Sequence, residues 1–184
     1  SVDRETTDAA SEAGETTWRN QDWSQYLGYD KTIPELRAVV DAVATWTVGK
    51  GFQANEETTM LLDAIEGFGK DTFNTILENM IRTMQIGGDS FAEIIRDGEG
   101  NLVNLKPLDP SVIAIVVNPK GIIIRYEQES KVKGRKPKKF QPIEILHLAR
   151  NRIADEIHGT SLIESLEWII KAKNEVQSIF KTVM

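Results

Sequence analysis

The first half of the chain places its apolar residues at a helical period. Between residues 34 and 88, three stretches repeat apolar side chains at every third or fourth position, and each stretch ends at glycines. Pro34, Asn55 and Asp71 stand at the predicted starts, where proline fixes a helical φ and asparagine or aspartate can cap exposed N–H groups. The pattern therefore predicts three amphipathic helices.

After Gly88 the period shortens toward two. Branched and aromatic residues gather in short runs, separated by turn sequences rich in glycine, proline and asparagine; the runs are 91–95, 102–105, 112–117, 122–126 and 143–148. Such runs predict an antiparallel β meander. Because helices come first and strands second, without alternation, we expect an α+β fold that ends in a long C-terminal helix.

That C-terminal helix is predicted for residues 161–184. Ser161 and Glu164 have the spacing of a capping box. Behind them, one face repeats at heptad-like spacing, with one polar position, and consists of Leu162, Leu166, Ile169, Lys173, Val176, Phe180 and Val183. We expect this face to pack against partners along its length, and, because no stop signal precedes Met184, we expect the natural chain to continue.

The polarity of the chain suggests three regions. Residues 1–31 form a flexible, polar and acidic N-terminal arm, residues 32–160 the α+β domain, and residues 161–184 the beginning of the long helix. The arm contains Trp18, Trp23 and Tyr26 among polar neighbours. These aromatics cannot form a core of their own, so docking on another subunit, packing on the same chain and disorder all stay open.

Composition narrows the function. The chain has 22 basic and 28 acidic residues, a net charge of −6, which opposes a generally basic surface that grips nucleic acid. The absence of cysteine excludes disulfides, thiolate nucleophiles and cysteine-bound metals. No apolar window is long enough to cross a membrane.

Positive charge is concentrated near the C-terminus, where residues 131–184 carry 11 basic and 6 acidic side chains. Much of it lies in one predicted loop between two strands, made of Lys131, Lys133, Arg135, Lys136, Lys138 and Lys139. Two interpretations stay open for this basic cluster. It is either a solvated loop tip or an electrostatic contact to an acidic partner.

No catalytic or metal-binding constellation is visible, so we predict no enzyme activity, no metal and no cofactor. His147 and His158 lack the helical spacing of a metalloprotease site. A triad of Ser161, His147 and Asp155 is disfavoured because Ser161 lacks the glycine elbow of a serine nucleophile and serves better as a helix cap. His147 follows apolar residues on a predicted strand, which favours a half-buried ring bonded to backbone or carboxylate groups.

Four segments in fixed order carry a family resemblance. Residues 88–97, 105–110, 140–148 and 158–162 resemble the portal protein family of tailed bacteriophages and related archaeal viruses. The resemblance covers roughly residues 32–184. Its framework positions, which set turns and element boundaries, are Pro107, Asp109, Pro110, His147, Gly159 and Ser161.

The resemblance implies a ring, commonly of twelve subunits, at one capsid vertex of the virion, made in the host cytoplasm. Terminase would drive double-stranded DNA in through the ring, and the DNA would later leave by it. Residues 32–160 would belong to the wing and residues 161–184 would begin the stem, in family chains that are much longer. Further partners would be the major capsid protein and the head–tail adaptor, and the basic cluster would face DNA or the inner capsid surface.

An alternative from a different class remains. The α+β platform would be a nucleic-acid-binding module that presents the lysine-rich loop 131–139 to a phosphate backbone.

Overall fold

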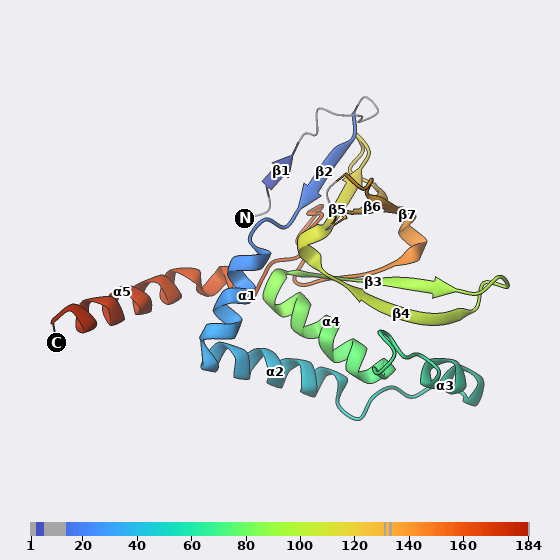
Figure 1. Ribbon diagram of the computed structural model, residues 1–184, viewed down its shortest axis with the longest axis horizontal. Helices are drawn as coiled ribbons and strands as arrows, with labels where there is room; N and C mark the ends of the chain where they lie inside the picture. The colour runs from blue at the N-terminus through green and yellow to red at the C-terminus, as the bar shows by residue number, and fades with distance from the viewer. Residues whose placement is uncertain (1–2, 6–13, 131, 133, 184) are drawn as a thin grey trace.

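The strands form two antiparallel sheets that stack on one another, and helices cover the outer side of one sheet (Figure 1). The computed structural model describes residues 3–5, 14–130, 132 and 134–183. The five-stranded sheet has the order β1-β2-β5-β6-β7, and the three-stranded sheet has the order β4-β3-β8. The α+β prediction is confirmed, with helix at the C-terminus.

The elements follow one another in this order: β1 (Asp3–Glu5), β2 (Thr16–Arg19), α1 (Trp23–Thr32), α2 (Pro34–Val48), α3 (Glu56–Asp63), α4 (Phe73–Gly87), β3 (Asp89–Arg96), β4 (Leu102–Leu108), β5 (Ile113–Val117), β6 (Ile123–Gln128), β7 (Lys138–Phe140), β8 (Ile145–Ala149) and α5 (Glu167–Val183). Short 3₁₀ turns precede β5, β8 and α5.

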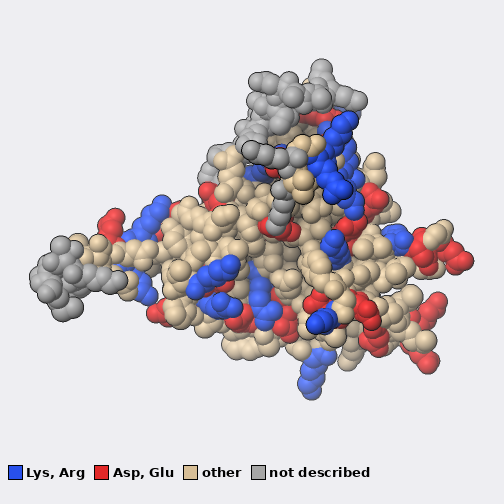
Figure 2. All heavy atoms as spheres, viewed as in Figure 1, with Lys and Arg blue, Asp and Glu red and all other residues tan. Residues whose placement is uncertain are grey.

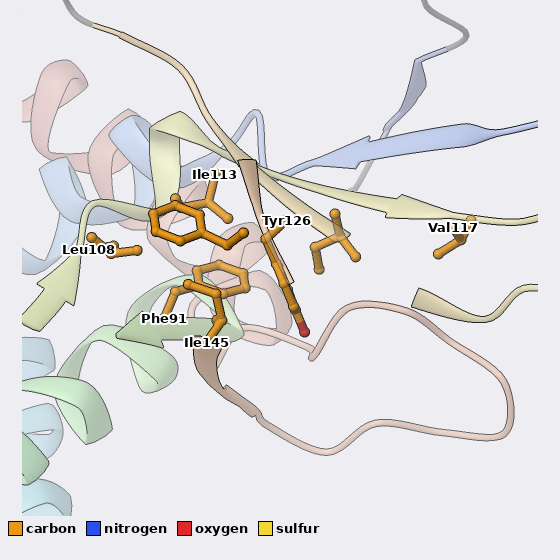
Figure 3. Packing of buried hydrophobic residues seen from close by; sticks show 8 residues of the cluster. Phe91, Leu108, Ile113, Val117, Tyr126 and Ile145 are labelled. Carbon is orange, nitrogen blue, oxygen red and sulfur yellow. The ribbon is translucent and has the colours of Figure 1, made fainter. Parts of the chain in front are cut away.

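The space between the two sheets is filled by apolar side chains (Figure 3). Phe91, Leu108 and Ile145 belong to the three-stranded side, and they meet Ile113 and Tyr126 from the five-stranded sheet. Alternation along β3 places Asp89 on the same face as Phe91. The Asp89 carboxylate, at the start of β3, therefore points toward the layer between the two sheets.

Helix α4 covers the opposite face of the three-stranded sheet. Its Ile76 and Met80 are buried against Ala92 of β3 and Leu105 of β4. The next layer is α2, which packs on α4 and is tied to it by an ion pair of 2.6 Å between Arg82 Nε and Asp41 Oδ1. The order of layers is thus sheet, sheet, α4 and α2.

The prediction of a flexible arm is wrong for residues 14–31, which pack on the rest of the chain. Strand β2 pairs with β5, and Glu15 accepts two hydrogen bonds from the Arg125 guanidinium, at 2.7 and 2.6 Å. Trp23 and Tyr26 of α1 are buried on the same chain. The arm was predicted because its aromatics have no local period, whereas their partners are supplied by segments distant in the sequence.

Several boundaries also differ from prediction. The strands divide between two sheets instead of one meander, and two of them precede the helices. Helix α4 is capped by Thr72, because the Asp71 carboxylate accepts instead from the Phe68 N–H at 3.0 Å. The predicted loop 131–139 includes the start of β7.

The base of α5 is fixed in a second apolar cluster. Ile163 is fully buried there among side chains of α1 and α2, together with Ile86 of α4. Ile170, one turn into α5, also belongs to this cluster. The start of the C-terminal helix is therefore part of the folded body.

We expect Ile163→Ala to lower the free energy of unfolding by about 2–4 kcal/mol, since it leaves a cavity in a closed cluster. Urea denaturation followed by circular dichroism measures the change. The matched control is Ile153→Ala, because Ile153 is 67% exposed and should lose less than about 0.5 kcal/mol. Equal effects of the two variants would contradict the anchoring role.

Candidate functional site

A buried carboxylate joins the sheets to the base of α5. Asp89, 1% exposed, accepts hydrogen bonds from His147 Nε2 at 2.8 Å, His158 Nδ1 at 2.6 Å and Gly159 N at 3.0 Å. Burial acts to raise the pKa of Asp89, but the hydrogen bonds from the two histidines outweigh it and hold that pKa below its ordinary value. The group is thus an ionised acceptor of three donors.

In neutral imidazoles these bonds define the tautomer of each ring. His147 donates from Nε2 to Asp89, so its Nδ1 accepts from the Tyr126 hydroxyl at 3.1 Å. Burial, together with the nearby charge of Asp89, raises the pKa of Tyr126 to about 12, which keeps that hydroxyl a donor. His147 also stacks on Phe91, with ring centroids 4.6 Å apart. The interpretation of His147 as a structural histidine with a carboxylate partner agrees with this geometry.

Two backbone segments, one at Gly88 and one at Gly159, cross in close contact beside Asp89, and we call this contact the Asp89 crossing. A Cβ atom on Gly88 would overlap the Gly159 carbonyl, and one on Gly159 would overlap the Gly88 carbonyl and the Arg150 backbone. Gly88 also has φ +87°, a conformation that favours glycine. Arg150 N donates to the Gly88 carbonyl at 2.8 Å across this crossing. Only glycine at both positions permits the contact.

Polar contacts continue from the crossing to the last turn before α5. The Arg150 guanidinium binds Gln85 Oε1 at 2.9 Å and the Thr160 carbonyl at 3.0 Å. Ser161 Oγ accepts from the Ile163 N–H at 2.9 Å and the Glu164 N–H at 3.4 Å. These bonds lie ahead of a 3₁₀ turn over Glu164–Leu166 whose N-cap is Ile163, and α5 begins only at Glu167, so Ser161 does not cap the long helix as predicted.

The framework residues of the family resemblance fall into two places. His147, Gly159 and Ser161 gather around the Asp89 crossing. Pro107 lies on the edge strand β4, where the ladder does not need its missing N–H, while Asp109 caps the 3₁₀ turn that begins at Pro110. The sequence reasoning missed Asp89 and His158, although both occur in the quoted segments, because only the fold reveals that they touch.

The serine triad considered from the sequence does not form. The Ser161 hydroxyl donates to the Ile86 carbonyl and binds no imidazole, so the triad with His147 and Asp155 is not formed. Within the described residues, no three histidine, aspartate or glutamate side chains are arranged to hold a metal ion. No helix in that part of the chain is long and apolar enough to span a membrane.

Helix α5 projects away from the rest of the molecule (Figure 1), and one apolar face of it is uncovered. Trp168, Ala172, Val176 and Ile179 follow at spacings of four, four and three, so they share one side of the helix. We call these four residues the α5 stripe. Trp168 is 72% exposed, Val176 51% and Ile179 62%. Figure 2 shows the same helix projecting from the molecule, away from the layers.

The predicted heptad face is divided by this geometry. Leu162 and Leu166 pack on the chain's own α1–α2 cluster, and Lys173 pairs with Glu35 of α2 at 3.2 Å. Ile169 and Val176 are instead exposed. The described contacts of this face with the body are confined to the base of the helix. The side chains of Phe180 and Val183 lie outside the described residues.

The basic cluster is also divided. Lys138 pairs with Glu93 at 2.6 Å and lies over the Phe140 ring, and Lys139 lies 3.8 Å from Glu127. Arg135 and Lys136 line a groove of about 530 Å³ beside β4 and β6, and neither forms an ion pair with a described residue. Lys131 and Lys133 lie outside the described residues.

Other proteins of known structure share this architecture. No protein-family profile and no curated protein matches the sequence. Solved structures do match. The chain shares its fold with components of gene transfer agent particles.

Three such structures are described as the virion of a native gene transfer agent (GTA) particle, the neck of an empty GTA particle computed with C6 symmetry, and the neck of a native GTA particle computed with C12 symmetry. Their TM-scores are 0.74, 0.74 and 0.75, with 18%, 17% and 18% identity over 88%, 88% and 89% of this chain. The match covers 44%, 45% and 45% of those chains. This chain therefore spans less than half the length of the structures it matches.

Replacing the central carboxylate tests its role. Asp89→Ala leaves three buried donors without an acceptor, so we expect the free energy of unfolding to fall by about 3 kcal/mol or more. The control Asp63→Ala removes an exposed carboxylate and should change it by less than about 0.5 kcal/mol. Chemical denaturation at neutral pH measures both.

Comparing wild type with Asp89→Ala at different pH values tests whether Asp89 is ionised. Because the native pKa of Asp89 is depressed, its contribution is complete above the unfolded value of about 3.9 and is lost as the pH falls through the native pKa. The difference between wild type and Asp89→Ala should therefore narrow only below about pH 4. A difference that disappears between pH 7 and 5 would contradict an ionised acceptor.

The backbone crossing gives a further prediction. Gly159→Ala forces two backbone segments apart, and we expect it to destabilise the protein by at least about 2 kcal/mol. Gly28→Ala is the control, since a Cβ on this helical glycine meets nothing and should stabilise α1 by about 0.5–1 kcal/mol. Thermal unfolding compares them, and a neutral Gly159→Ala would contradict the close contact.

Proposed function

We propose that the protein is a portal-type subunit of a phage-like particle. The observation that carries the proposal is α5, which is anchored in the body at Ile163 and Ile170 but exposes the α5 stripe. A contiguous apolar face that is exposed on a protein surface marks an interaction site, because contact between water and apolar side chains is unfavourable. The fold shared with GTA neck and virion chains supports a structural component of a head–tail particle.

In this proposal, copies of the chain assemble as a homo-oligomeric ring. The related necks are described with C6 and C12 symmetry, which supports a cyclic assembly, and twelve is the number we propose. A heterologous contact repeated by rotation closes into such a ring. The α5 stripe provides part of that contact, with helices of neighbouring copies side by side.

The ring would stand at the portal vertex of the capsid as a conduit. Terminase would package double-stranded DNA through it, the major capsid protein would surround it, and a head–tail adaptor would bind below it for ejection. The net charge of −6 suits a conduit, since a strongly basic wall would retain phosphates. The role is structural, without catalysis or cofactor.

The alternative of a nucleic-acid-binding module has weaker support. Lys138 and Lys139 of the basic cluster are engaged by Glu93 and Glu127, so they contribute little net charge to a phosphate contact. Salt-dependent binding of duplex DNA by the monomer would favour this alternative.

Electron microscopy and mass photometry of the natural full-length protein test the proposal. We expect closed rings for the wild type. The double variant Trp168→Ser/Val176→Ser should weaken association about tenfold or more at each interface, because it removes most of the apolar area of the stripe.

The control is Asn174→Ala/Gln177→Ala, which changes exposed polar residues of α5 outside the stripe and should leave the rings intact. Failure of the wild type to form rings would refute the proposed function. Unchanged rings in the stripe variant would refute the role of the stripe.

A further inference from the structure

A cavity beside the Asp89 crossing has buried polar atoms in its wall that no described residue partners. It measures about 420 Å³ and is lined by β2, residues 155–160 and the turn before α5. His158 is 7% exposed and donates a hydrogen bond from Nδ1 to Asp89; in the neutral imidazole this leaves a lone pair on Nε2, which is buried and has no hydrogen-bond partner among the described residues. Trp18 Nε1, on another wall of the cavity, is also buried without a partner among these residues. Because buried polar groups are normally hydrogen-bonded, both atoms need a partner from outside the described residues.

The walls of the cavity are acidic. Asp155, Glu156 and Glu164 line it, and no lysine or arginine does so among the described residues. Asp155 and Glu156 form no ion pair within the part of the chain that the structure describes. We call this cavity the His158 pocket.

The chemistry of the His158 pocket matches a cationic donor. In the neutral imidazole of His158 the Nε2 lone pair needs a donor, and the carboxylates favour a positive charge beside it. A guanidinium provides both, with several N–H groups in one plane that can also stack on the Trp18 ring. The remaining donor, Trp18 Nε1–H, would meet a backbone carbonyl of the segment that carries the cation.

The chain itself presents such a segment. Arg135 and Lys136 lie on the turn between β6 and β7, are exposed, and form no ion pair with a described residue. In the five-stranded sheet, this turn belongs to the edge formed by β6 and β7, whereas the His158 pocket lies beside β2, near the other edge. One copy therefore has a basic projection at one edge and an acidic pocket near the other.

We propose that the His158 pocket receives Arg135 from the β6–β7 turn of an adjacent copy, with Lys136 facing Asp155 and Glu156. This inference rests on the proposed ring, because a heterologous cyclic contact joins two different surfaces of the same chain. Charge complementarity of this kind determines which surfaces meet and in which register. The contact would link the domains outside the stem, in addition to the α5 stripe.

Reversing the charges on each side of the contact tests whether the β6–β7 turn pairs with the His158 pocket. In the full-length protein, Arg135→Glu/Lys136→Glu and Asp155→Lys/Glu156→Lys should each weaken ring association at least tenfold by mass photometry. The protein with all four changes should recover association to within about threefold of wild type. The control Lys70→Glu/Lys120→Glu makes the same charge change at exposed sites elsewhere and should have no effect.

Crosslinking tests the contact itself. The chain has no cysteine, so a crosslink between two introduced cysteines shows that those two positions are close together. With Arg135→Cys and Glu156→Cys in one chain, a short bis-maleimide should give a ladder of covalent multimers on a denaturing gel. A two-fold contact would stop at dimers, and the control pair Lys120→Cys/Glu156→Cys should stay monomeric.

The outcomes separate this inference from the proposed function. Absence of rings in the wild type refutes the ring and the pocket contact together. Wild-type rings that persist in both charge-reversed doubles, or that give no ladder, refute the pocket contact alone. Failure of the fourfold variant to recover, while its circular dichroism and melting match wild type, also refutes it. Loss of capsid or terminase binding with unchanged rings would assign the pocket to a different protein.

Discussion

The buried carboxylate of Asp89 connects three segments that are distant in the sequence. It lies at the start of β3, receives one histidine from β8, and binds His158 and Gly159 in the loop that leads to α5. A buried charge with a missing donor would be costly, so each of these partners restricts where the others can lie. The glycine crossing beside it has the same effect through steric contact, because neither Gly88 nor Gly159 leaves room for a side chain.

This constraint determines the direction of the C-terminal helix. Residues 159–163 are held by Asp89, Arg150 and the Ser161 hydroxyl, and Ile163 is buried among α1 and α2. Because the start of α5 cannot rotate, the exposure of the α5 stripe follows from helical spacing. The α5 stripe therefore makes no contribution to the apolar clusters of the folded body.

The elements that could be predicted from the sequence are those whose pattern is local. Helices α2 and α4 follow from apolar spacing and glycine ends, and the hairpin of β3 and β4 follows from its turn at residues 97–100. Helix α3 has the predicted Asn55 cap, but it ends at Asp63, before the glycines, and none of its residues is buried, so its predicted length and apolar face were wrong. Strand β2 and helix α1 were assigned to an arm, because β2 has four residues and gains its hydrogen bonds from β5, almost a hundred residues later. A period of two likewise predicts strands without saying which strands pair, so one meander was expected where two sheets exist.

The sequence by itself determined the fold class and most helix and strand positions. These features depend on spacing and on residue type within a few positions. Only the tertiary structure decided that Asp89 binds two histidines, that the heptad face divides between the body and solvent, and that an acidic pocket forms around His158. The Asp89 contacts join residues 58 to 70 positions apart, the Lys173–Glu35 contact on the divided face joins residues 138 positions apart, and the pocket joins Trp18 to residues 155–160; no local pattern encodes such distances.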